Sequence, residues 1–184
     1  VPNGVGGMIA ILGATIEEIN KILKENNKKF LCFIANDNCD GQIVVSGKLN
    51  DLELFEIELK KNNIKSVKLS VSAPFHCPLM SNATNVMREF ILKTDFKDPI
   101  VDIISNVTAK PVNETKNIQK LLIEQIEKPV RWRESINNMI LSGTSNFIEI
   151  GPGKVLSGLV KRIDRNMKIN QVNNLADAKN LIND

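Results

Sequence analysis

His76 is the only histidine among the 184 residues, and it lies in the stretch SVSAPFHCPLM, residues 70–80. Imidazole takes up and returns protons near neutral pH, so this residue is a candidate general base. Pro74 and Pro78 flank it, directly after a run that has the pattern of a strand. A lone histidine next to prolines is more often structural, but irregular segments at strand ends often carry active-site groups in α/β proteins, which strengthens the case for catalysis.

Cys77 is the nearest group that such a base could deprotonate, because thiol and imidazole form a common catalytic pair. Adjacent residues of an extended segment point to opposite sides, so the sequence predicts that His76 and Cys77 do not face each other. We therefore expect Cys77 to be a packed thiol, and a Cys77-dependent thiol hydrolase stays open as an alternative. The sequence contains no GxSxG elbow, which would supply a serine nucleophile.

Two further stretches have residue types that bind ligands. In EIGPGKVLSGLVKRI, residues 149–163, a strand, a Gly-Pro-Gly turn and a helix from about Lys154 would present free N–H groups to an anion. A tight strand-to-helix connection explains the same glycines and is the interpretation we favour, since no Walker motif is present. KPVRWRESI, residues 128–136, is either a recognition strip or a packed tryptophan with solvated charges.

The composition limits the class of protein. The 42% of hydrophobic residues can form a real core, and a net charge of +3 from scattered lysines argues against nucleic-acid binding. No apolar run approaches the about 20 residues of a membrane span. Cys32, Cys39 and Cys77 have no metal-ligand spacing, so we expect a reduced, cytoplasmic protein without a metal site. The chain begins at Val1 instead of methionine, and we expect it to start inside a longer protein.

The elements that must position these residues are readable from hydrophobic periodicity. Residues 1–71 predict the order βαββαβ, with helices near 15–26 and 49–63 and a turn at DNCDG between the central strands. That order is typical of the ferredoxin-like split βαβ fold.

After residue 72 the rhythm changes. Helices are predicted near residues 79–93, 118–127, 133–142 and 154–165, with a terminal helix, and strands at 99–105, 146–151 and near Ile169. Alternating strands and helices imply crossovers and a parallel sheet. Two or three strands make only a thin parallel sheet, and parallel sheets are usually covered on both faces. We therefore expect this region to be part of a larger α/β domain.

Five stretches, taken in order, resemble the malonyl-CoA:acyl-carrier-protein transacylase family of type II fatty acid synthesis. They are VPNGVGGMIAILG, NDNCDGQIVVSG, SAPFHCPLM, EQIEKPVRWRESI and EIGPGKVLSGLVKRI. The resemblance covers nearly the whole chain. It implies an α/β (α+β) fold in which residues 1–71 form a ferredoxin-like subdomain and residues 72–184 form the C-terminal part of an α/β-hydrolase-like acyltransferase domain.

The resemblance also implies residue roles. His76 matches the catalytic histidine of the family, and Gln125 matches the residue whose backbone carbonyl orients that histidine. Asn38 and Gln42 match a turn near the substrate cleft. Phe75 matches the form of the motif that favours malonyl over larger branched acyl groups. The implied reaction moves malonyl from coenzyme A to a seryl acyl-enzyme and then to the phosphopantetheine thiol of acyl carrier protein, without a metal or other cofactor.

The sequence departs from the family in one respect, because the GHSxGE serine elbow, the carboxylate-binding arginine and the oxyanion-hole glutamine have no match in it. We therefore expect this chain to be the C-terminal portion of the enzyme and to be inactive alone. We expect the full-length enzyme to be a monomer. A non-catalytic ferredoxin-like binding module is the alternative. Acyl carrier proteins are acidic, so six basic residues are candidates for docking, with solvated helix faces as the other interpretation. They are Lys128, Arg131, Arg133, Lys154, Lys161 and Arg162.

Overall fold

The computed structural model describes residues 4–183, and its chain forms two compact units, Val1–Ser135 and Ile136–Asp184. Val1–Asn3, the first residues of the VPNGVGGMIAILG stretch, lie outside the described residues. The expected subdomain boundary after residue 71 stays a prediction, since the compact units divide elsewhere. None of the described helices combines the length and the apolar character needed to cross a membrane.

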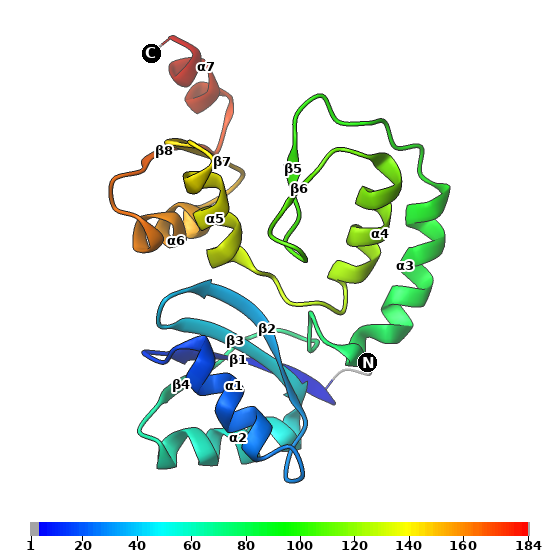
Figure 1. The fold of residues 1–184 in the computed structure, drawn as a ribbon, viewed down its shortest axis with the longest axis vertical. Helices are drawn as coiled ribbons and strands as arrows, with labels where there is room; N and C mark the ends of the chain where they lie inside the picture. Colours follow the sequence, from blue (N-terminus) through cyan, green and yellow to red (C-terminus); the bar gives the residue numbers. More distant parts are fainter. Residues whose placement is uncertain (1–3, 184) are drawn as a thin grey trace. The chain divides into compact units, whose positions relative to one another are not determined.

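The first half of unit 1 is a four-stranded antiparallel sheet with two helices (Figure 1). The elements are β1 (Gly6–Leu12), α1 (Ile16–Glu25), β2 (Cys32–Cys39), β3 (Gln42–Lys48), α2 (Leu49–Lys61) and β4 (Lys65–Lys68). The strand order is β2-β3-β1-β4, so β3 lies between β1 and β2. This split βαβ arrangement confirms the predicted ferredoxin-like order.

Alternation along the strands builds two layers of core. Ile9 and Ile11 of β1 pack in one cluster with the buried faces of α1 and α2, where Phe55 is fully buried. Met8 points to the opposite face of the sheet, where it packs in a separate cluster. Helix α1 begins as its sequence predicts, because Thr15 and Glu18 form a capping box.

The second half of unit 1 is helical with a short hairpin. Its elements are a 3₁₀ turn (Pro78–Met80), α3 (Ser81–Lys93), β5 (Ile103–Ile104), β6 (Pro111–Val112) and α4 (Thr115–Gln125). Helices α3 and α4 lie side by side in Figure 1 and contact each other.

The prediction of a long strand over residues 99–105 is wrong. Only Ile103 and Ile104 are in a strand, and they pair antiparallel with β6, which lies in the predicted loop. The reason is local: the amide of Ala109 donates to the carbonyl of Ser105 at 2.7 Å, and this tight turn folds the chain back on itself. The hairpin therefore replaces the expected crossover at this point.

In unit 2, the predicted parallel pairing is present. Helix α5 (Trp132–Leu141) runs into the unit, followed by β7 (Asn146–Ile150), α6 (Val155–Ile163), β8 (Lys168–Val172) and α7 (Leu175–Asn183). β7 and β8 pair in parallel through α6, as a βαβ crossover requires. The helix ends of both units lie within a few residues of the predicted ones.

The Gly-Pro-Gly turn does not leave an open anion site at the start of α6. The carboxylate of Glu149 accepts the amides of Leu156 at 3.1 Å and Ser157 at 2.7 Å. The chain's own carboxylate thus occupies the positive helix end, which supports the tight connection over an external ligand.

Candidate active site

His76 lies in a loop that contacts two strands of the sheet of unit 1, β1 and β3. Pro74 is fully buried, and it packs so closely on Gly6 that a Cβ there would lie 2.5 Å from the proline ring. The hydroxyl of Ser46, on β3, donates to the carbonyl of Phe75. His76 itself has a φ of 60°, a left-handed conformation that is unusual for a residue with a side chain. Such strain is often found at functional positions.

The imidazole of His76 contacts the end of α4. Its Nδ1 lies 2.8 Å from the carbonyl oxygen of Gln125 and 3.5 Å from the Gln125 side-chain Nε2. That Nε2 donates instead to the carbonyl of Lys128, at 3.0 Å. The shorter contact is to an acceptor, so we assign the proton to Nδ1. The lone pair of the His76 Nε2 then remains available to receive a proton.

Cys77 points into the protein, as the sequence predicts. Its Sγ is fully buried and donates to the carbonyl of Pro74 at 3.1 Å. Burial raises the pKa of this thiol, so the reactive thiolate is disfavoured. His76 is half-buried and bonds to a different partner. The contacts of the two residues therefore do not support a Cys–His pair.

An open groove of about 510 Å³ is lined by His76. One wall is α1 with the chain that follows it, including Lys24, and the other is the segment 127–129, including Lys128. This volume is in the range of small-molecule sites. The groove therefore brings the imidazole, two lysines and apolar side chains of unit 1 to one surface.

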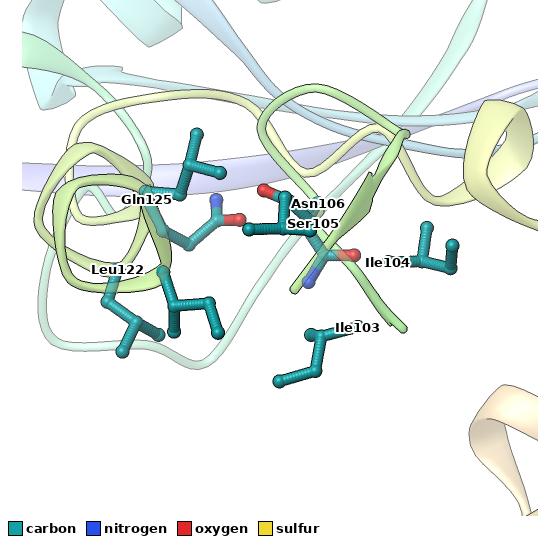
Figure 2. A pocket seen from close by; sticks show the side chains of 9 residues that line it. Ile103, Ile104, Ser105, Asn106, Leu122 and Gln125 are labelled. Atoms are coloured by element: carbon teal, nitrogen blue, oxygen red, sulfur yellow. The ribbon is translucent and has the colours of Figure 1, made fainter. Parts of the chain in front are cut away.

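A second cavity, of about 200 Å³, lies between α4 and the β5–β6 hairpin (Figure 2). Most of its lining is aliphatic, including Ile103, Ile104 and Leu122, and the Gln125 side chain is its polar wall with Ser105 and Asn106. His76 does not line it. Gln125 thus contributes its backbone to the imidazole and its side chain to a separate apolar cavity.

The structure does not place Asn38 and Gln42 beside His76. Both lie where β2 and β3 meet, whereas the loop of His76 is attached at Ser46, which pairs with Phe33. Asn38 is five residues beyond Phe33, or about 16 Å along the strand. Phe75 is next to the imidazole in sequence, and its ring is 39% exposed. The predicted substrate-binding roles of these three residues stay predictions.

Two of the predicted docking residues are engaged in ion pairs within unit 1. Arg131 donates from Nε and from a terminal nitrogen to Glu134, both at 2.7 Å. Arg133 bonds to Asp37 at 3.0 Å and to Asp40 at 2.9 Å. The tryptophan between them, Trp132, is half-buried. KPVRWRESI therefore has a half-buried tryptophan between arginines that are paired with acids and still partly exposed, at 42% and 28%, so both interpretations of this stretch stay predictions.

The remaining candidates differ in their surroundings. Lys128 is exposed at the groove in unit 1. In unit 2, Lys154 is exposed before α6, and Lys161 donates to the carbonyls of Arg165 at 3.1 Å and Met167 at 2.7 Å. Arg162 is exposed on the same helix. Within residues 4–183, no three His, Cys, Asp or Glu side chains are grouped so that they could hold a metal ion.

Sequence reasoning missed three residues that fix this site: Ser46, Asp37 and Pro129. Ser46 has the pattern of an ordinary strand position and Asp37 that of a turn residue, and their partners are 29 and 96 residues away. Pro129 carried a signal, since it lies two residues after the predicted helix at residues 118–127.

Comparisons with known proteins give a consistent result. A Bacillus subtilis malonyl CoA-acyl carrier protein transacylase is 46% identical over 173 residues, which are 91% of this chain and 54% of that protein. The crystal structure of the Clostridium perfringens transacylase matches with a TM-score of 0.93 at 37% identity, over 100% of this chain and 58% of that one.

A complex described as a type II PKS acyl-carrier protein with its malonyl-transacylase matches with a TM-score of 0.92 at 32% identity, over 100% of this chain and 60% of that chain. No family model matches. The chain therefore spans little more than half the length of the proteins it resembles.

Proposed function

We propose, from the homology of this chain to malonyl CoA-acyl carrier protein transacylases, that it carries the general base of a malonyl transferase. The observation on which the proposal depends is the 2.8 Å contact between Nδ1 of His76 and the Gln125 carbonyl. An imidazole whose Nδ1 proton is bound by a fixed acceptor can take up a proton only at Nε2. The carbonyl belongs to the last residue of α4, so the helix holds it in place.

The proposed reaction has two half-reactions with the same proton route. Nε2 of His76 takes the proton of a serine hydroxyl as its oxygen attacks the malonyl thioester, and the imidazolium returns that proton to the departing coenzyme A sulfur. In the second half, Nε2 takes the proton of the carrier-protein phosphopantetheine thiol, whose sulfur attacks the acyl-serine ester. The serine oxygen leaves and recovers its proton from the imidazolium. No redox or metal chemistry enters the proposal.

We propose that the serine comes from a part of the whole protein outside these 184 residues, which would make this chain a C-terminal portion that is inactive alone. Two features support the proposal. The chain covers only 54% and 58% of the first relatives. Each unit also exposes large apolar side chains of a kind that folded proteins usually bury. On α3 these include Phe90, at 64% exposure, and in unit 2 they include Ile150, at 79%.

The proposed partners are malonyl-CoA and an acyl carrier protein in the cytoplasm, with a monomeric full-length enzyme. The groove that contains His76 would receive the phosphopantetheine arm, since Lys24 and Lys128 supply positive charge for its phosphate. Lys128, Lys154, Lys161 and Arg162 stay candidates for docking the acidic carrier protein. Arg131 and Arg133 are poorer candidates, because their guanidinium groups already bind carboxylates.

The test is malonyl transfer to holo acyl carrier protein by the full-length protein that contains this chain. We expect His76→Ala to lower the rate by about 10²–10⁴-fold, the usual contribution of a general base. Cys77→Ser is the matched control, since it removes the thiol but keeps a hydroxyl that can donate to the Pro74 carbonyl, and it should leave the rate within a few-fold. The reverse result would identify a thiol hydrolase. A full-length protein that binds carrier protein but transfers no malonyl group would identify a binding module.

A further inference from the structure

We infer that Pro129 is a positioning residue, which leaves the Gln125 carbonyl free for His76 because proline has no N–H. The inference extends the proposed function, since it explains how the partner of the catalytic imidazole is kept available. It concerns a hydrogen bond, however, and the bond can be measured whether or not the protein transfers malonyl.

The argument begins with the last turn of α4. The amide of Lys128 donates to the carbonyl of Glu124 at 2.9 Å, four residues earlier, as in a continuing helix. The next bond of that series would run from the amide of residue 129 to the carbonyl of Gln125. Residue 129 is proline, so this bond cannot form. The Gln125 carbonyl therefore has no amide four residues later in the chain that could donate to it.

The chain after Pro129 is fixed, so the carbonyl is also held in place. The amide of Val130 donates to the carbonyl of Ala35 at 2.8 Å, and the Val130 carbonyl accepts the amide of Asp37 at 2.9 Å. The amide of Arg131 donates to the carbonyl of Asn106 at 2.9 Å. Proline also disfavours a helical conformation of Lys128, which helps the helix to end here.

The side chain of Gln125 completes the turn. Its Nε2 donates to the Lys128 carbonyl at 3.0 Å and lies 3.5 Å from Nδ1 of His76, so the backbone carbonyl, at 2.8 Å, is the closer partner of the imidazole. A backbone donor at position 129 would compete with His76 for the Gln125 oxygen. The imidazole would then lose the contact that selects the Nδ1-protonated tautomer.

The experiment is a ¹⁵N NMR spectrum of the full-length protein that contains this chain. His76 is the only histidine of these 184 residues, and its ring signals are assigned by their loss in His76→Ala. In the unmodified protein we expect a pyrrole-type Nδ1 and a pyridine-type Nε2. In Pro129→Ala, we expect the chemical shifts of the two ring nitrogens to move toward values averaged over the two tautomers. We also expect a scalar coupling across a new hydrogen bond from the amide of residue 129 to the Gln125 carbonyl.

Two controls separate the effect of the missing N–H at position 129 from the effect of removing a proline ring. Pro152→Ala removes an exposed proline in unit 2 and should leave the ring signals unchanged. A semisynthetic chain with N-methylalanine at position 129 lacks both the N–H and the proline ring, and it should keep the signals of the unmodified protein. If Pro129→Ala leaves the imidazole unchanged, or if the N-methyl chain shifts as much as Pro129→Ala, the inference is wrong. If Pro129→Ala does not fold, the N-methylalanine chain becomes the test. A pyrrole-type Nδ1 in that chain would support the inference, and its loss would contradict it.

Discussion

At the scale of single residues, the site depends on one imidazole in a strained backbone. A left-handed residue other than glycine costs about 1–3 kcal/mol, which the surrounding structure must offset. Buried Pro74 and the Ser46 hydroxyl hold the residues on the N-terminal side of His76. Buried Cys77 holds the other side. The strain is therefore confined to the one residue whose side chain must leave the core.

The thiol of Cys32 predicts a specific loss of stability at high pH. Burial, and then the charge of Asp51, raise its pKa from 9.0 to about 12. The unfolded thiol ionises near 9, so the stabilisation from keeping this thiol neutral is complete below pH 9 and falls as the pH rises toward 12. The fall should reach about 1.4 kcal/mol per pH unit.

Urea unfolding of the unmodified protein and of Cys32→Ala between pH 8 and pH 11 measures this effect. The substitution removes the titrating group, so the stability difference between the two proteins should shrink as the pH rises. A difference that is the same at every pH would contradict the assigned burial of this thiol.

At the scale of elements, the segment that carries the Gln125 carbonyl is attached to the β2–β3 hairpin. Val130 forms a parallel bridge with Asn36, and Arg133 binds Asp37 and Asp40 at the end of the same hairpin. The end of α4 and the edge of β2 are therefore held together by backbone and ionic contacts. We expect the ion pair that is less exposed to water to contribute more to the stability of the fold.

Asp37 and Asp40 make a matched pair for testing this contact. The Asp37 side chain is 11% exposed and that of Asp40 is 91% exposed, and both bind Arg133. Asp37→Ala should cost about 1.5–3 kcal/mol, as expected for hydrogen bonds to a charged group away from water. Asp40→Ala should cost about 0–1 kcal/mol. Denaturant unfolding measures both, and equal losses would show that burial does not set the strength of this contact.

Most elements could be predicted because their signals are local. Helix α1 begins at a capping box, and β1 is a short apolar run that begins with glycines and is buried almost throughout. The prediction for segment 99–105 was wrong because an apolar run has the pattern of a strand whether or not a neighbouring strand pairs with it. The turn that begins at Ser105 determines which residues pair. The contact of His76 with Gln125 joins residues 49 apart, so no periodicity could predict it, and only the family resemblance did.

At the scale of the whole molecule, the structure gives two compact units and a chain that covers little more than half of its relatives. In unit 2, the pair β7 and β8 has Ile148 and Ile150 exposed, and parallel strands are usually covered on both faces. In unit 1, the apolar cavity beside α4 opens next to the residue that holds the imidazole. These surfaces are consistent with the proposed origin of the serine in another part of the full protein.

The central claim is that the Gln125 carbonyl holds the proton of His76 on Nδ1 and leaves Nε2 as the base. The most direct measurement is the pair of ¹⁵N chemical shifts of this single imidazole at a pH where the ring is neutral. We predict a protonated, pyrrole-type Nδ1 and an unprotonated, pyridine-type Nε2. The opposite assignment, with the proton on Nε2, would mean that Nδ1 accepts from the Gln125 side chain, and it would contradict the proposed base.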